Sequence, residues 1–218
     1  MKFTRILSVL ALAAVATFVT GCATSPLSPY HVTAYKPHDP SKVSVKVSLS
    51  KQNVYVMEGS RCLMAVACTV GKPDHPTPKG SFRIYSKIPN KRSGSYGFTR
   101  SGAPADASRG QSVDVGYPMP FWCEFAPAYG FHQGFVWTVP HTHGCIRLHK
   151  EAAPRFYELV RIGTPVNIAN SQPEDETLGK SVQRINQAND PDPAVSVSMS
   201  PRAFEKPQGP LLIDQPQS

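Results

Sequence analysis

The chain has 218 residues, of which 40% are hydrophobic and 17% are charged, and it contains 22 prolines and 15 glycines. This length suits one catalytic domain with terminal extensions, and the low charged fraction argues against a coiled coil or a largely helical protein. The formal net charge of +8 suits an anionic partner, such as nucleic acid, an envelope surface or an acidic substrate, and does not choose among them.

The N-terminus has the pattern of an export signal. Lys2 and Arg5 precede an apolar run over residues 6–19, which is shorter than the roughly 20 residues that a transmembrane helix needs. The small residues that follow lead to Cys22, a pattern similar to the lipobox of bacterial lipoproteins. We predict a signal peptide over residues 1–21 and a lipid on Cys22. The alternative is an ordinary signal peptide that leaves this cysteine unmodified.

These features place the protein in the cell envelope, anchored by the lipid and facing the periplasm. Residue 23 is Ala and not the Asp that would suggest retention in the inner membrane, so the outer membrane is favoured. Export also argues against a nucleic-acid partner.

Charge and proline content divide the mature chain into three parts. Residues 22–41 contain four prolines and are predicted to be a stiff linker from the lipid anchor. Residues 42–170 are the expected catalytic domain. Residues 171–218 contain seven prolines and an excess of acidic residues, with no long apolar pattern, and we predict a disordered tail with at most a short helix over residues 177–188.

Alternating apolar residues predict mainly strands in the middle part, with one helix where apolar residues recur at helical spacing. A polar stretch over residues 89–117, rich in Gly, Ser and Arg, is interpreted as a long loop. We hypothesise that it forms a mobile wall in which Tyr96 and Phe98 contact substrate, and the alternative is a solvated insertion that makes no such contact. The domain is therefore predicted to be β-rich α+β. The expected elements are strands over residues 43–49, 52–57, 61–70, 81–88 and 164–169 and a helix over residues 151–162.

The residues with catalytic chemistry gather between positions 129 and 149. His132 and His143 lie near Cys145 in the sequence, and an imidazole can take the proton of a thiol to create a nucleophile. Gly144 before the cysteine allows backbone N–H groups to approach a developing oxyanion. Arg147 has the planar fork that binds a carboxylate. Together they indicate an enzyme that attacks an amide in a carboxylate-bearing substrate.

Two other interpretations of these residues stay open at this point. Cys145 is a small residue that also suits a buried core position. His132, His143 and Cys145 are zinc-ligand types, although their spacing matches no closed zinc motif.

The segment over residues 142–148, Thr-His-Gly-Cys-Ile-Arg-Leu, preceded by Phe131-His132, resembles the signature of L,D-transpeptidases with the YkuD-type catalytic domain. Three further stretches agree with that family in order, over residues 76–80, 119–122 and 163–166. The resemblance implies a YkuD-like β-sandwich of mixed strands with one main helix after the catalytic cysteine. It implies no cofactor, no metal requirement, and acylation of Cys145 by carbapenems.

Carried over to this sequence, the resemblance assigns a role to each motif residue. Cys145 would be the nucleophile and His132 the general base, with the backbone carbonyl of Gln133 orienting the imidazole. His143 would lie close to the sulfur, and the amide of Gly144, with those of its two neighbours, would form an oxyanion hole.

Arg147 and Tyr129 would bind the substrate, a peptidoglycan stem peptide. The implied activity is transfer: Cys145 attacks the amide between the L-centre of a diamino acid and a terminal D-Ala, and an amine of another stem or of an envelope protein takes the acyl group. Such an enzyme serves cell-wall biogenesis and cell shape. The alternatives are an L,D-carboxypeptidase or endopeptidase on the same scaffold, and a non-catalytic lipoprotein that tethers the membrane to the wall.

Three cysteines remain besides Cys22 and Cys145. Cys62 and Cys68 are expected on one strand, an even number of residues apart and therefore on the same face, too distant to pair with each other. Cys123 could pair with either, so at most one disulfide is predicted.

Overall fold

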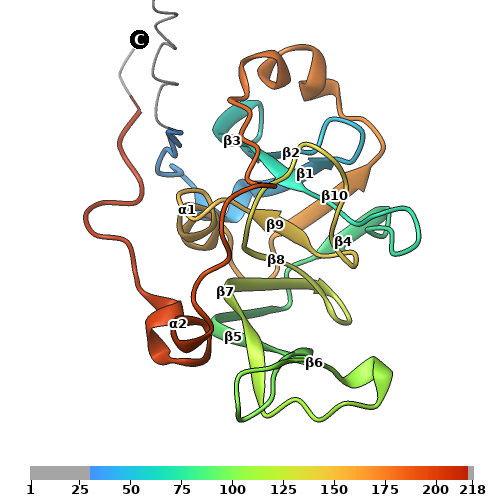
Figure 1. The fold of residues 1–218 in the computed structure, drawn as a ribbon. Helices are drawn as coiled ribbons and strands as arrows, with labels where there is room; N and C mark the ends of the chain where they lie inside the picture. Colours follow the sequence, from blue (N-terminus) through green and yellow to red (C-terminus); the bar gives the residue numbers. More distant parts are fainter. Residues whose placement is uncertain (1–29, 216–218) are drawn as a thin grey trace, which may run out of the picture.

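The computed structural model describes residues 30–215, so the predicted signal peptide and the lipidation site at Cys22 lie outside the described residues. Ten strands form one mixed sheet in the order β4-β10-β1-β2-β3-β9-β8-β7-β5-β6. The view in Figure 1 has β4, β10, β1, β2 and β3 in its upper half and most of the other strands below them. Within residues 30–215, no helix is long and apolar enough to cross a membrane. The strands are β1 (Val43–Ser48), β2 (Asn53–Glu58), β3 (Arg61–Thr69), β4 (Gly80–Arg83), β5 (Ser86–Phe98), β6 (Pro104–Asp106), β7 (Val115–Ala126), β8 (Tyr129–Gln133), β9 (Ile146–Leu148) and β10 (Pro165–Ala169).

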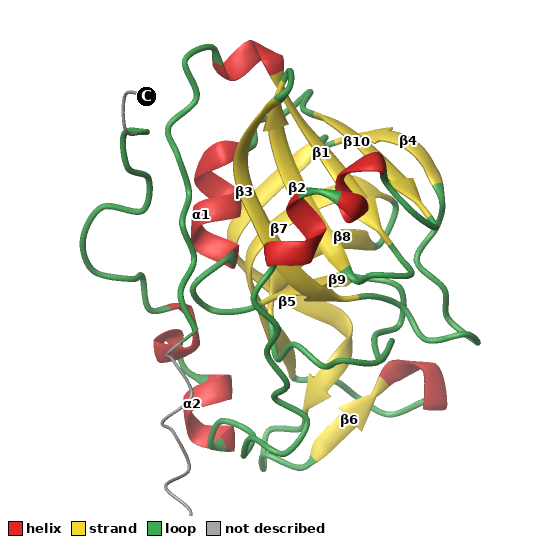
Figure 2. Ribbon diagram, turned by 90° about the horizontal axis from the view of Figure 1, so that it is seen from above, coloured by secondary structure: helices red, strands yellow, loops and turns green. Residues whose placement is uncertain are grey.

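Helices are few and short. The α-helices are α1 (Ala153–Leu159) and α2 (Val195–Met199), and the 3-10 turns are η1 (Pro40–Lys42), η2 (Ala107–Arg109), η3 (Pro173–Glu176), η4 (Leu178–Ser181) and η5 (Pro201–Phe204). Figure 2 shows how small a share the helices take beside the curved strands. The predicted β-rich class with one main helix after Cys145 is thereby confirmed.

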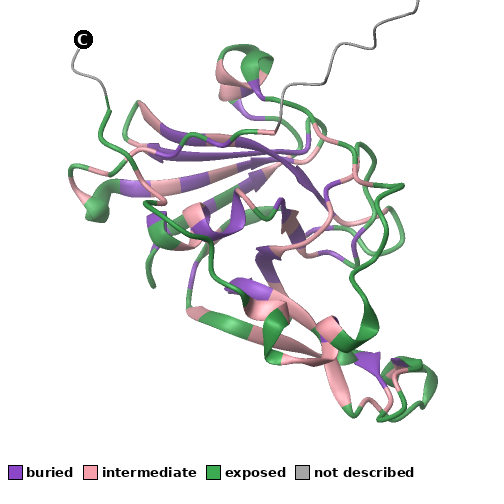
Figure 3. Cartoon of the chain, turned by 60° about the vertical axis from the view of Figure 1, so that its left-hand side comes forward, coloured by how far each residue is buried: buried purple, intermediate pink, exposed green. Residues whose placement is uncertain are grey.

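The first strands follow directly from the sequence pattern. Alternating valines place one face of β1 in the core, and β1 pairs antiparallel with β2 and parallel with β10. The β2–β3 hairpin turns at Gly59, whose φ of +60° suits glycine. Helix α1 buries Phe156, whose ring centroid lies 4.4 Å from that of Phe131 on β8. This contact packs the strand that carries His132 against the core. Figure 3 shows where buried and exposed residues lie along the chain.

The stretch over residues 89–117 is not the predicted loop. Its first part belongs to β5 and its last residues to β7, and these two strands pair antiparallel and extend beyond the core as an arm capped by β6. Its glycines permit close strand approach: a Cβ on Gly97 would lie 2.2 Å from the carbonyl oxygen of Val115. The Gly-, Ser- and Arg-rich composition therefore belongs to an exposed two-stranded arm. Residue types within one strand do not reveal the partner strand, so the local pattern did not predict this pairing.

Residues 171–215, which we call the C-terminal strap, follow an ordered path along the domain and do not form the predicted disordered tail. Asp175 is buried and accepts hydrogen bonds from the side chains of Tyr55 and Ser48, each at 2.7 Å. Further along, the guanidinium of Arg92 on β5 donates to the carbonyl oxygens of Ser198 and Ser200 at 2.9 and 3.0 Å. Polar attachments of this kind leave no apolar periodicity, which is why the sequence pattern did not indicate them.

The end of the predicted linker also packs on the domain. Val32 and Ala34 are buried, and Tyr35 forms an isolated β-bridge with Ile213 near the end of the strap. The two terminal segments thus meet on the domain surface.

The cysteine prediction was wrong in one respect. The β2–β3 register shifts next to Met57, so a bulge reverses the alternation within β3. Cys62 then packs with Tyr55 and Met57, whereas Cys68 lies in the main core on the opposite side. Cys62, Cys68, Cys123 and Cys145 are all free thiols, within the prediction of at most one disulfide.

Candidate active site

Two parallel neighbouring strands bring the motif residues together. β8 and β9 pair so that Phe131 lies opposite Ile146 and His132 opposite Arg147. Cys145 directly precedes β9 and is half-buried, with its Sγ 3.7 Å from the carbonyl oxygen of Ala128 just before β8. Residues that the sequence separates by more than ten positions therefore lie on two neighbouring strands in the middle of the sheet.

His132 is held as a neutral base. Its side chain is 6% exposed, and its Nδ1 lies 2.8 Å from the carbonyl oxygen of Gln133. Because a carbonyl only accepts, Nδ1 carries the proton and Nε2 keeps its lone pair. Burial, reinforced by the charge of Arg147 and opposed by the Gln133 bond, lowers the pKa of His132 to about 4. The imidazole is therefore neutral at neutral pH, with its one proton on Nδ1.

The thiol of Cys145 is also neutral at rest. Burial raises its pKa above the ordinary value, although the backbone N–H of Gly130 and the charge of Arg147 favour the thiolate and Glu124 opposes it. The resting pair is thus a thiol and an imidazole. For this thiol to become a nucleophile, its proton would have to pass to a base.

Only glycine fits at position 144 without a backbone or side-chain shift. Its φ is +106°, and a Cβ at this position would lie 2.3 Å from Cε1 of the Tyr129 ring. Its carbonyl oxygen accepts a hydrogen bond from the hydroxyl of Thr77 at 2.9 Å. Tyr129 therefore packs against the motif turn, which is a contact additional to its expected role with substrate.

The expected oxyanion role of the Gly144 amide does not fit this geometry. Its N–H donates to Oγ1 of Thr142 at 3.0 Å, and the same hydroxyl donates to the carbonyl oxygen of Cys145 at 2.6 Å. The Gly144 N–H is therefore already used within the turn. Of the three amides considered, those of His143 and Cys145 remain as donors to an oxyanion. Thr142 and Thr77 are supporting residues whose role was missed, although both belong to the family-like stretches.

His143 is exposed beside the turn and is held by rings from two other segments. The Tyr96 ring on the arm stacks on it with a centroid distance of 5.0 Å and an interplanar angle of 11°, and His75 meets it edge-on at 4.8 Å. Burial, then the charges of Lys72 and His75, lower the pKa of His143. The arm therefore reaches the site through Tyr96.

Arg147 is half-buried next to His132. Its methylenes pack against Gly134, where a Cβ would lie 2.9 Å from Cδ of the arginine. Within residues 30–215 no carboxylate forms an ion pair with it, which leaves the guanidinium available to a substrate carboxylate.

His149, which follows β9, is buried. Its ring lies edge-on to Tyr30 at a centroid distance of 4.5 Å. In the described part of the chain, no group of three His, Cys, Asp or Glu side chains is arranged to hold a metal.

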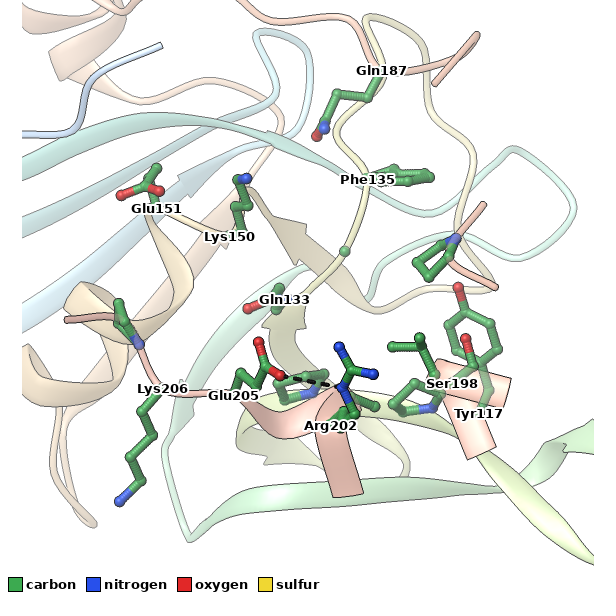
Figure 4. A pocket seen from close by; sticks show the side chains of 17 residues that line it. Tyr117, Gln133, Phe135, Lys150, Glu151, Gln187, Ser198, Arg202, Glu205 and Lys206 are labelled. Atoms are coloured by element: carbon green, nitrogen blue, oxygen red, sulfur yellow. Dashed lines mark ion pairs between the residues drawn. The ribbon is translucent and has the colours of Figure 1, made fainter. Parts of the chain in front are cut away.

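A hollow of about 470 Å³ lies beside this site, between the domain and the C-terminal strap. In the view of Figure 4, Lys150 and Gln187 lie on one side, the Arg202–Glu205 ion pair on the other, and Gln133 between them. Sequence reasoning gave no signal for it, because the strap that forms half of it was expected to be disordered.

The sequence model of the YkuD family, the L,D-transpeptidase catalytic domain, matches residues 42–168. The chain belongs to this family. It is 31% identical over 105 residues to "Probable L,D-transpeptidase 3" of Mycobacterium tuberculosis, covering 45% of this chain and 36% of that protein. It is 27% identical over 126 residues to "L,D-transpeptidase 1" of the same organism, covering 56% of this chain and 48% of that protein.

The chain thus spans less than half the length of these two curated relatives. Among solved structures, an L,D-transpeptidase from Mycobacterium smegmatis is similar with a TM-score of 0.48 and 20% identity, covering 59% of this chain and 58% of that one.

Proposed function

We propose that this member of the family is a peptidoglycan L,D-transpeptidase with Cys145 as nucleophile and His132 as general base. The observation that carries the proposal is the orientation of His132: Nδ1 is bound to the Gln133 carbonyl, and the low pKa leaves Nε2 free to accept a proton. Family membership supports the reaction class.

In the first step, His132 removes the thiol proton and Sγ attacks the carbonyl carbon of the amide between the diamino acid and D-Ala. The amides of His143 and Cys145 are the proposed donors to the oxyanion, and Arg147 binds a stem carboxylate. The C–N bond then breaks, the proton passes from His132 to the leaving amine, and D-Ala departs. The stem remains on Cys145 as a thioester.

In the second step, the amine of another stem or of an envelope protein attacks the thioester carbonyl. A C–N bond forms, the C–S bond breaks, and His132 takes the amine proton and returns it to sulfur. Water in place of the amine would make the enzyme a carboxypeptidase. No metal or cofactor enters either step.

We also propose that a lipid on Cys22 anchors the enzyme in the envelope, facing the periplasm with the outer membrane favoured. The support is the N-terminal pattern of basic, apolar and small residues before Cys22. The mass of the mature N-terminal peptide from membranes tests this, with Cys22→Ser as the control that should lack the lipid.

The deciding experiment incubates the full-length protein with disaccharide-tetrapeptide and identifies products by mass spectrometry, beside a Cys145→Ala control. A dimer with the mass of two stems minus one D-Ala, absent from the control, is the expected result. Tripeptide without dimer would support the hydrolase. Untouched substrate in both samples would contradict both activities and favour the tethering function.

A further inference from the structure

The hollow between the domain and the C-terminal strap is built jointly by the two parts of the chain. The domain contributes β7 through Tyr117, the end of β8 through Gln133, and Lys150 after β9. The strap contributes residues between 187 and 207, all of them outside the part matched by the family. A volume of about 470 Å³ lies in the range of pockets that hold small ligands.

The hollow adjoins the reacting groups through β8 and Arg147. Gln133, which lines it, is the residue whose carbonyl oxygen holds His132. Gly134 also lines it and packs directly on the Arg147 side chain. The charge of Arg147 acts both on the Cys145 thiol and on the phenol of Tyr117 in the lining. Arg147 therefore links the nucleophile to the hollow.

The lining suits a peptide that carries carboxylates. Glu151 is paired with Arg155, and Glu205 with Arg202. Within residues 30–215, by contrast, no carboxylate pairs with Lys150. The side-chain amide of Gln133 and the hydroxyls of Tyr117 and Ser198 add neutral hydrogen-bonding groups, as in Figure 4. The amide of Gln187 is already bonded to the Val136 N–H and the Asp190 carboxylate.

From these observations we infer that the hollow binds the acceptor stem, the second peptide, whose amine resolves the thioester on Cys145. This inference rests on the proposed function and names where its second substrate binds. The donor stem must reach Sγ itself, and neither Cys145 nor His143 belongs to the lining. A peptide in the hollow approaches from the Arg147 side, with its carboxylate toward Lys150 and its amine toward the thioester. Amine attack forms the C–N bond and breaks the C–S bond, and the amine proton returns to sulfur through His132.

The test supplies the full-length protein with unlabelled disaccharide-tetrapeptide as donor and isotopically heavy disaccharide-tripeptide as acceptor, which lacks D-Ala and cannot donate. The readout is mixed dimer formed per D-Ala released. Lys150→Glu reverses the charge of the lysine that the domain contributes to the lining, and Ala203→Trp fills the hollow from the strap side. Lys180→Glu is the matched control, because Lys180 is an exposed strap lysine outside the lining.

We expect mixed dimer per D-Ala to fall about tenfold in Lys150→Glu and in Ala203→Trp, with water taking the thioester and tripeptide accumulating, while Lys180→Glu matches the wild type. The inference is overturned if the ratio in both lining variants equals that of the control, or if D-Ala release and dimer fall in proportion while the wild type forms mixed dimer. A wild type that releases D-Ala without any dimer, or releases no D-Ala, would instead contradict the proposed function and the inference with it.

Discussion

The motif turn, residues 142–145, and the C-terminal strap are held in different ways. In the turn, the buried hydroxyl of Thr142 accepts from the Gly144 N–H and that of Thr77 donates to the Gly144 carbonyl oxygen. The Tyr129 ring leaves no room for a Cβ on Gly144. The strap is held at separate points, among them Asp175 near its start, Gln187 against the Val136 backbone, and α2 through Arg92, with largely exposed residues between them. A single added atom should therefore disrupt the turn, whereas the strap should lose its attachments one at a time.

The largest effect is expected at Gly144. Gly144→Ala forces a Cβ into the Tyr129 ring at a positive φ, and we expect a loss of about 4 kcal/mol in the free energy of unfolding, together with the activity. Gly59→Ala is the control, because Gly59 also has a positive φ but no atom within 4 Å of the added Cβ, and should cost about 1 kcal/mol. Urea denaturation measures both. Equal losses would show that backbone conformation, and not the packing of the turn, sets the cost.

Acid should weaken the domain through His132. Its pKa is lowered to about 4 in the fold from the ordinary 6.5, so the unfolded chain binds the proton first as pH falls. The stabilisation is complete above pH 6.5 and is lost between about 6.5 and 4, by at most roughly 3 kcal/mol. His132→Gln should flatten the pH dependence of unfolding in this window. A variant that keeps the wild-type slope there would assign the acid sensitivity to other groups.

The contribution of the strap to stability is tested by changing its buried carboxylate, Asp175. Burial tends to raise the pKa of Asp175, but hydrogen bonds from the Gln172 N–H, Tyr55 and Ser48 outweigh it and hold that pKa below its usual range. Asp175→Asn replaces one acceptor oxygen by an NH₂ group that faces hydrogen-bond donors of Tyr55, Ser48 or Gln172. It should lower the free energy of unfolding by about 2 kcal/mol. Asp190→Asn, at an exposed strap carboxylate, should cost less than about 0.5 kcal/mol.

The same Asp175→Asn protein should retain D-Ala release at 25 °C, because the carboxylate lies outside the motif turn. If Asp175→Asn lost D-Ala release as completely as Gly144→Ala, the strap and the motif turn would not be held independently.

The smallest expected effect is at Thr142. Thr142→Val keeps the side-chain shape but removes the hydroxyl that binds the Gly144 N–H and the Cys145 carbonyl. We expect the rate of D-Ala release to fall about tenfold, about 1.4 kcal/mol in activation free energy, with KM for tetrapeptide little changed. Thr142→Ser should restore the rate. If Ser fails to restore it, the methyl packing of Thr142, and not its hydroxyl, supports the turn.

Local sequence patterns predicted the fold correctly where the conformation depends only on neighbouring residues of the same segment. The alternating valines of β1 and the Gly59 turn of the β2–β3 hairpin each follow from side-chain period or a positive φ. They did not indicate the bulge near Met57, which moved Cys62 and Cys68 to opposite faces. A bulge depends on cross-strand pairing, which residue types within one strand do not reveal.

The sequence by itself determined the family and the β-rich class and predicted the residues with the chemistry, because these depend on residue types in a fixed order. The bond from His132 to the Gln133 carbonyl, expected from the family resemblance, has that geometry in the structure. Only the tertiary structure decided the state of each group, since burial sets the pKa of His132 and the Thr142 hydroxyl takes the Gly144 N–H. It also decided the path of the strap, because Asp175 and Arg92 find their partners far away in sequence. The hollow beside Arg147 exists only through those long-range contacts.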